Sequence, residues 1–277
     1  MIEIDALPQL RDPVLVVALA GWVDAGLAGG GTVALLQEQL ESARTFARLD
    51  LADLMDLQQT RPTVHLVDGV SRQISWPEIT FSAGRLGRDV VLCTGPEPSL
   101  RWREVLGDVV DLARRLGTSA AFTVGGIPSM ASHRRPLSVL ATGTDEELVA
   151  RAGAWRQDYT GPTGAQSVVQ VMLGDVGIPT LALWAQVPHY LAGGASPPAI
   201  RAVLERLREL GGLAVDLAGL DEQSDAYLRR VEEGLTERPD VVEVIQAIEA
   251  GEASEAELPS GDELASEIER FLRDQSS

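Results

Sequence analysis

The sequence predicts an α/β fold: a three-layer α/β/α sandwich on a mixed sheet, with a helical appendage at its C-terminal end. Short apolar runs of strand length alternate with stretches of helical periodicity up to about residue 216. This alternation favours a parallel or mixed sheet that helices cover on both faces. Beyond that point only helical periodicity continues. We therefore expect an α/β core over residues 1–216 and an acidic helical appendage, packed on the core, over residues 217–277.

The first part of the core should supply most of the strands. The apolar run 14–20, bounded by Pro13 and Gly21, is typical of a buried parallel strand. Asp24 then opens a helix-like stretch to about Leu40. The Asp68-Gly69 dipeptide between two β-rich runs is a strong hairpin signal. Further strands are expected over residues 45–51, 64–67, 70–75, 79–82 and 89–94.

The second part should alternate strands and helices more regularly. Ser99 is expected to cap a helix that runs to about Leu116. Strands are expected over residues 120–124, 137–141 and 180–186, and helices over 145–151, 161–175 and 197–210. In the appendage the periodicity predicts helices over 221–233, 240–250 and 262–273, the last one preceded by an acidic linker over 252–261.

Charge and composition exclude several classes of function. The formal net charge is −18, and residues 221–277 contribute −12 of it, from 17 acids and 5 arginines. Such a chain repels phosphate backbones and anionic lipids, so we expect no nucleic-acid or membrane partner. The chain has no lysine, which rules out Schiff-base and P-loop lysine chemistry.

No apolar run is long enough for a membrane helix and the N-terminus lacks a basic start, so we expect a soluble cytoplasmic protein.

Metal and thiol chemistry are also not expected. The single cysteine, Cys93, lies in an apolar run, which favours a buried inert thiol over a nucleophile. The three histidines have no i, i+3 or i, i+4 partners of metal-ligating type. We therefore expect no structural metal and no cofactor, and we assign no catalytic residue.

Polar and aromatic residues follow the expected strands in two N-terminal loops. In open α/β sheets, ligands bind at this edge. In the first loop, Trp22 and Asp24 precede a glycine-rich turn that could cradle a phosphate, although Asp24 could equally cap the next helix. In the second loop, Glu97 could act as a general base, or it could pair with Arg101 at i, i+4 spacing.

Two further loops complete the set. His133 and Arg135 follow a Gly-Gly pair that could bind an anion, although surface ion pairs would also explain the arginine. Trp184 is the kind of aromatic that anchors interfaces, and His189 could exchange protons or simply hydrogen-bond within its loop. The candidate pocket or interaction loops therefore carry eight residues: Trp22, Asp24, Glu97, Arg101, His133, Arg135, Trp184 and His189.

Taken together, these segments resemble a known family. The segments are GWVDAG, RPTVHLVDG with ISWP, GPEPSLRW, GGIP with HRRP, DYTGPTGAQSVV, LWAQVPHY and LPSGDELASEIERFL. In order and spacing they are similar, from about residue 10 to residue 273, to the actinobacterial branch of the proteasome assembly chaperone two (PAC2-like) family. The resemblance implies an α/β/α core like that of nucleoside phosphorylases and peptidyl hydrolases. It also implies oligomerisation, and it brings no established enzymatic reaction.

The chain departs from the family pattern at two places. The third loop reads Ser132-His133-Arg134-Arg135-Pro136, where the family usually has proline-histidine-threonine-arginine-proline. Relatives that dock on proteasome rings end in a hydrophobic-tyrosine-any-residue tail, whereas this sequence ends Asp-Gln-Ser-Ser. Docking through such a tail is therefore not expected.

Two functional hypotheses follow. The first is a non-enzymatic, assembly-chaperone-like or interaction protein that forms homo-oligomers and binds other proteins, with Trp22, Trp102, Trp155 and Trp184 as exposed loop aromatics. The alternative is a binder of, or enzyme acting on, a small anionic or nucleoside-like ligand at the C-terminal strand edge. Convergence of the eight candidate side chains on one enclosed pocket would favour the alternative, and their use in packing or subunit contacts would favour the first.

Overall fold

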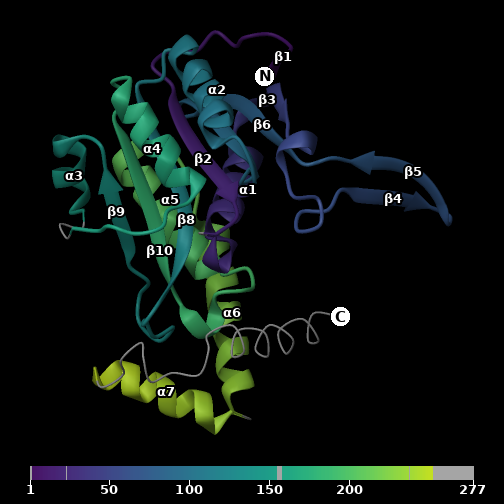
Figure 1. Cartoon of the computed structure of the whole chain (residues 1–277). Helices are drawn as coiled ribbons and strands as arrows, with labels where there is room; N and C mark the ends of the chain where they lie inside the picture. The colour runs from purple at the N-terminus through teal and green to yellow at the C-terminus, as the bar shows by residue number, and fades with distance from the viewer. Residues whose placement is uncertain (1, 23, 155–157, 237, 252–277) are drawn as a thin grey trace.

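The chain folds into three layers, an eight-stranded mixed sheet with helices on both faces (Figure 1). This computed structural model describes residues 2–22, 24–154, 158–236 and 238–251. The predicted three-layer α/β/α architecture is confirmed. The strand order is β1-β3-β6-β7-β2-β8-β10-β9, and β4 and β5 form a separate two-stranded sheet.

Four parallel strands form the centre of the sheet. β2 (Val14–Ala20) lies between β7 (Arg88–Pro96) and β8 (Ala120–Ser129), so that Val14 is in register with Val90 on one side and Ala120 on the other. β10 (Thr180–Pro188) extends the parallel set beyond β8. Residues on both faces of β2 are buried, which explains its unbroken apolar run.

Antiparallel strands flank this centre on both sides. β6 (Glu78–Leu86) pairs with β7, β3 (Glu41–Asp50) with β6, and the short β1 (Glu3–Ile4) with β3. On the other side β9 (Val139–Gly143) pairs with β10. Because β3 runs parallel to β7, it ends at the edge where the four central strands end.

The hairpin predicted around Asp68-Gly69 is confirmed. β4 (Thr63–Val67) pairs with β5 (Val70–Ser75), and Asp68 and Gly69 both have positive φ, 50° and 73°. Positive φ at both central residues suits the type of turn that matches the twist of two antiparallel strands. The hairpin is inserted between β3 and β6, so it leaves the body from the same edge and projects away from it (Figure 1).

One face of the sheet is covered by α2 (Trp102–Arg115) and α4 (Ala165–Asp175). In α2 the buried side chains recur on one stripe, as an amphipathic helix requires. They pack with Leu15, Val17 and Cys93 from the strands beneath. Cys93 is fully buried in β7, and burial raises the pKa of its thiol, which keeps it protonated.

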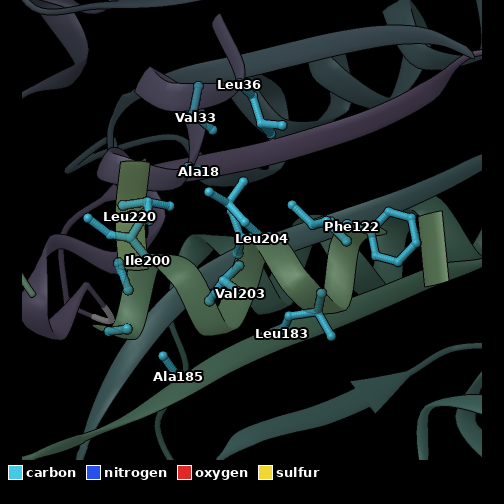
Figure 2. Close-up of a cluster of buried hydrophobic side chains, with 14 of the residues drawn as sticks. Ala18, Val33, Leu36, Phe122, Leu183, Ala185, Ile200, Val203, Leu204 and Leu220 are labelled. Carbon is cyan, nitrogen blue, oxygen red and sulfur yellow. The ribbon is translucent and has the colours of Figure 1, made fainter. Parts of the chain in front are cut away.

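The opposite face carries α1 (Ala28–Gln39) and α5 (Pro197–Gly211), whose packing against the strands is shown in Figure 2. A short 3₁₀ turn over Ala25–Leu27 precedes α1, so the α-helix begins four residues after Asp24. A Cβ atom on Gly29 would lie 2.5 Å from the carbonyl oxygen of Val124 in β8. Glycine at this position is what allows α1 to lie so close to the sheet.

Two further helices follow α5 in the described chain, and the short α3 (Glu146–Ala152) lies beside β9. α6 (Ala218–Leu235) and α7 (Pro239–Ala250) bury Leu220, Tyr227 and Ile245 in the cluster that contains α1 and α5. This shared core supports the division into a core of 1–216 and an appendage of 217–277, which stays our proposal. The predicted linker 252–261 and helix 262–273 lie outside the described residues.

The prediction for the start of the helix after the second loop was wrong. Ser99 does not cap α2; its Oγ accepts a hydrogen bond from the backbone N–H of Asp56, 2.9 Å away. Arg101, with φ of 57°, precedes the helix instead.

Among the described residues, no helix is long and apolar enough to cross a membrane.

The close approach of α1 to β8 gives a direct test of the fold. Gly29→Ala should lower the free energy of unfolding by about 1–3 kcal/mol, because the new methyl group overpacks against backbone that cannot yield. The matched control is Gly219→Ala in α6, where a Cβ meets nothing within 4 Å. Helix propensity should make that variant neutral or up to about 1 kcal/mol more stable. Chemical denaturation measures both, and equal effects would contradict this packing.

Candidate functional site

The four candidate loops meet at one edge of the sheet. Trp22 follows β2, Glu97 follows β7, His133 comes shortly after β8 and His189 follows β10 directly. The four strands are parallel neighbours, so their carboxyl ends lie side by side. What the side chains do at this edge decides between the two functional hypotheses.

Asp24 stabilises the start of α1. Its backbone forms an isolated parallel bridge with Gly126, and its Oδ1 accepts a hydrogen bond from the N–H of Gly29, 2.6 Å away. Its Oδ2 lies 3.4 Å from the N–H of Gly30. Burial raises the pKa of this carboxyl group, and the two N–H groups oppose that shift. The geometry matches the capping interpretation, with a 3₁₀ turn inserted before the helix.

Glu97 is packed into the edge between two segments. Its backbone N–H donates to the carbonyl of Ala20, 2.7 Å away, and a Cβ atom on Gly21 would lie 2.7 Å from that of Glu97. Burial raises the pKa of the Glu97 carboxyl group, while the N–H groups of Ala165 and Trp22 oppose the shift. Its Oε2 is buried and makes no hydrogen bond to a described residue.

Arg101 does not join the other candidates. Its guanidinium is exposed and pairs with Glu104, with Nε 2.9 Å from Oε2, instead of with Glu97. The neighbouring Trp102 is half-buried as the first residue of α2, and its Nε1 donates to the carbonyl of Pro98. The second loop is therefore held by its own local contacts.

His133 is buried in a hydrogen-bonded chain that links the third loop to the fourth and to α6. Its Nδ1 lies 2.8 Å from the hydroxyl oxygen of Tyr190, and its Nε2 lies 3.0 Å from Oε1 of Glu232. Burial is the main cause that lowers the pKa of His133, and the Glu232 carboxylate opposes it. Burial also raises the pKa of Tyr190 to about 12. Through its contact with Glu232, the imidazole of His133 holds α6 in place.

The residues around His133 bind the same two helices. Arg134 donates to both carboxylate oxygens of Glu232, at 2.7 and 3.0 Å. Ser132 Oγ donates to Oε1 of Glu249 at 2.6 Å, and Arg135 Nη2 donates to the backbone carbonyl of Glu249 at 3.0 Å. We call residues 132–135 with Glu232 and Glu249 the C-terminal clamp. Every one of its loop residues contacts the appendage.

The two appendage residues of this clamp, Glu232 and Glu249, were not identified from the sequence. Glu232 and Glu249 are two of many acids on the polar faces of amphipathic helices, so nothing in the sequence distinguishes them. Tyr190, which like Trp184 is an aromatic of the kind that anchors interfaces, has a fully buried side chain instead. The sequence feature that indicated a site of ion pairs here was the pair of adjacent arginines, Arg134 and Arg135, in an acidic chain.

His189 is the least satisfied of the candidates. It is 9% exposed, and neither ring nitrogen makes a hydrogen bond to a described residue. Burial lowers the pKa of this imidazole, although the backbone of Ser129 opposes the shift. The ring stacks edge-on against Tyr190, with centroids 5.3 Å apart. His189 is therefore held in its neutral form by packing.

The tryptophans divide between core and surface. The expectation that Trp184 is an exposed loop aromatic was wrong, because it lies within β10 and is 7% exposed. Trp22 is 62% exposed at the end of β2. Trp155 lies outside the described residues. Of the three of these four aromatics that lie in the described chain, Trp22 is the one that is more than half exposed to solvent.

Two cavities of the described chain lie away from these loops. One, of about 590 Å³, lies between β1 and α2; the other, of about 710 Å³, lies at the opposite strand edge beside Arg11, Arg85 and Arg88. Within the ranges given above, no group of three or more His, Cys, Asp or Glu side chains is placed to hold a metal ion. The candidate side chains other than Arg101 and Trp184 thus lie at one edge, but most of them contact protein groups.

Large exposed apolar side chains gather at the same edge. Trp22 and Leu100 lie in the loops after β2 and β7, Tyr159 lies in the segment before α4, and Trp76 precedes β6. Each of these four side chains is more than half exposed. We call Trp22, Leu100 and Tyr159 the strand-end apolar residues. A concentration of such residues is typical of a protein-binding surface.

Comparison with known proteins identifies relatives over most of the chain. The model of the PAC2 family matches residues 18–235. A PAC2 family protein from Streptomyces avermitilis is 36% identical, covering 80% of this chain and 95% of that one, with a TM-score of 0.75. A proteasome-assembly chaperone homologue from Mycobacterium tuberculosis is 33% identical over 84% of this chain and 99% of that one, with a TM-score of 0.77. No curated protein matches the chain.

The C-terminal clamp predicts that Glu232 holds the appendage on the core. Glu232→Ala should destabilise α6 and α7 by about 1–2 kcal/mol, because hydrogen bonds to charged groups are lost and the buried His133 ring loses a partner. Hydrogen–deuterium exchange should speed up across residues 218–250. Glu233→Ala, an exposed neighbour on the same helix, is the control. Equal exchange in the two variants would show that the clamp does not hold these helices.

The partly buried carboxyl group of Glu97 predicts that the free energy of unfolding depends on pH. Its pKa is raised by folding, so its favourable contribution is present below the unfolded pKa and is lost as pH rises through the folded pKa. Glu97→Gln, which stays neutral, should therefore melt a few degrees higher than the wild type at pH 7, with the difference vanishing near pH 4. Glu38→Gln, an exposed glutamate on α1, should show no such trend. A melting difference independent of pH would contradict this account.

Proposed function

The chain belongs to the PAC2 family, and from this premise we propose that it is a non-enzymatic, assembly-chaperone-like protein that binds other protein subunits. Its contact surface is the sheet edge where the parallel strands end, and its strand-end apolar residues make the contact. A cytoplasmic location is part of the same proposal.

One observation carries this proposal: most of the polar groups that could have formed an active site are bound to other groups of the protein. Asp24 binds the start of α1, Arg101 pairs with Glu104, and the loop 132–135 binds α6 and α7. An active site needs side chains whose free lone pairs and protons face a substrate. Apolar side chains face solvent at this edge instead, with Trp22, Leu100 and Tyr159 each more than half exposed.

The likeness to relatives suggests the kind of subunit that is bound. The Mycobacterium tuberculosis relative is described as a proteasome-assembly chaperone homologue. We propose that this chain likewise binds proteasome subunits before or during assembly. Aromatic anchors on a rigid sheet edge suit this role, because they supply contact area with little loss of side-chain entropy.

A small-ligand function is the alternative, and one observation favours it. His189 has two buried ring nitrogens without hydrogen-bond partners among the described residues, and Glu97 has one such oxygen. Both groups belong to strand-end loops, where an anionic or nucleoside-like ligand would bind. Against this, several neighbouring polar groups of the same loops bind other groups of the protein.

Native mass spectrometry separates the two functions. The full chain, purified from its own host without a tag, should be mixed with the α and β proteasome subunits of that host. The proposal predicts complexes of this chain with unassembled subunits. The double variant Trp22→Ala, Leu100→Ala should weaken them at least tenfold, since buried aromatic anchors dominate such contacts.

Val171→Ala on α4 is the matched control, because Val171 is 56% exposed but lies away from the strand ends. It should leave binding unchanged. A mass increase from a co-purified small molecule that Glu97→Gln or His189→Ala abolishes, with no subunit complex, would support the ligand function and overturn the proposal.

A further inference from the structure

The cavity of about 710 Å³ lies at the strand edge opposite the candidate loops. Two segments line it: residues 9–12, which lead into β2, and residues of the turn 85–89, which joins β6 to β7. A volume between about 300 and 1,000 Å³ is typical of sites that bind small molecules. The cavity therefore has room for one small molecule.

The charge of this lining is opposite in sign to that of the protein. Arg11, Arg85 and Arg88 line the cavity together with the acids Asp12 and Asp89, which gives a net charge of +1. The whole chain, by contrast, carries 23 arginines and 41 acids. The cavity is thus a small basic region on a strongly acidic protein, and its charge favours a negatively charged ligand.

The guanidinium of Arg88 is fixed in the cavity wall without a carboxylate partner. Its Nη1 donates to the carbonyl of Gly211 at 3.1 Å, and its Nη2 donates to the carbonyl of Asp12 at 2.7 Å. The same Nη2 donates to the hydroxyl oxygen of Ser119 at 3.0 Å. All three acceptors are uncharged, so they hold the side chain in place and leave its positive charge without a neutralising carboxylate.

The other two arginines keep donors available to a ligand. Arg85 is 60% exposed, and its Nη1 donates to Oδ1 of Asp89 at 3.1 Å. The second carboxylate oxygen of Asp89 accepts from the backbone N–H of Arg11 at 2.7 Å, so Asp89 is occupied by these two contacts. The guanidinium of Arg11 makes no hydrogen bond or ion pair with another described residue. Its donors are therefore free to bind an anion.

Distance separates this cavity from the acidic appendage. Glu232 and Glu249 contact the loop after β8, at the edge where the parallel strands end, whereas the cavity lies where β2 begins. The seven residues of β2 span about 23 Å at about 3.3 Å per residue. That separation is well beyond the screening length of about 8 Å at physiological salt. The local arginines therefore decide the sign of the potential that a ligand meets in the cavity.

We propose that this cavity binds the phosphate ester of a small polyhydroxylated molecule, such as a sugar phosphate. A phosphate monoester carries close to two negative charges at neutral pH, which suits Arg11 and Arg88, the two guanidiniums without carboxylate partners. Arg11 and Arg85 bind the phosphate oxygens, because the guanidinium fork matches phosphate geometry. The carboxylate of Asp12 and the amide of Gln9 accept hydrogen bonds from the hydroxyl groups. This site is independent of the strand-end surface proposed above for other proteins.

Isothermal titration calorimetry of the full chain tests the site. The probes are glucose 6-phosphate, ribose 5-phosphate and glycerol 3-phosphate, with inorganic phosphate and glucose as references. At least one ester should bind saturably at millimolar concentration, more tightly than inorganic phosphate, and glucose should not bind. Arg11→Gln and Arg85→Gln should each weaken that ester about tenfold or more, since each removes charge-assisted hydrogen bonds. Arg103→Gln, an exposed arginine on α2, is the matched control and should bind like the wild type.

Hydrogen–deuterium exchange of the wild type locates the ligand independently of the variants. The bound ester should slow exchange in residues 9–12 and 85–89 and leave the strand-end loops unchanged. Absence of saturable binding by all three esters would overturn the proposal, as would binding that both cavity variants retain. Equal affinity for inorganic phosphate would overturn the assignment of a phosphate ester, because the hydroxyl contacts would then contribute nothing.

Discussion

The structure depends on one topological constraint: four parallel strands end at the same edge of the sheet. Their loops bring polar side chains into a crowded space where buried groups need hydrogen-bond partners. The loop after β2 satisfies the constraint locally, because Asp24 binds the start of α1, and Glu97 after β7 does so in part, through the N–H groups of Trp22 and Ala165. The loop after β8 is held by more distant residues. It takes its partners from the appendage, in Glu232 and Glu249.

This arrangement binds several chemically capable residues of the edge to other groups of the protein. The imidazole of His133 is buried between Tyr190 and Glu232, and the guanidinium of Arg134 is bound at both its Nε and Nη2. Groups held in this way fix helices in position and are not free to exchange protons with a substrate. Trp22 and Leu100, in the first two loops, remain more than half exposed to water. Protein binding is the function that such a surface supports.

Much of the fold could be predicted from the sequence because the signals are local. β2 follows from its apolar run between Pro13 and Gly21, and the hairpin follows from Asp68-Gly69. Trp184 could also have been placed in the core, since it lies inside the apolar run of β10. The start of α2 was missed because Arg101 adopts a positive φ, which is rare for arginine and leaves no sequence signal.

The candidate site was harder to predict because its decisive contacts are long-range. The sequence located His133 and Arg135, but their partner Glu232 lies 99 residues from His133, and Glu249 lies 114 residues from Arg135. On the helices themselves these glutamates look like any other solvated acid. The resemblance to the family agreed with the predicted fold, whereas the roles of residues 132–135 became visible only in their contacts with the appendage.

Hydrogen–deuterium exchange of the full chain, alone and mixed with proteasome subunits of its host, tests the central claim most directly. If the strand-end loops are internal supports and the exposed apolar residues are the contact surface, subunits should slow exchange around Trp22 and Leu100. Exchange across residues 129–136 should stay unchanged, because the C-terminal clamp already holds that loop. Slower exchange in 129–136 and around His189, with none around Trp22 and Leu100, would contradict the account.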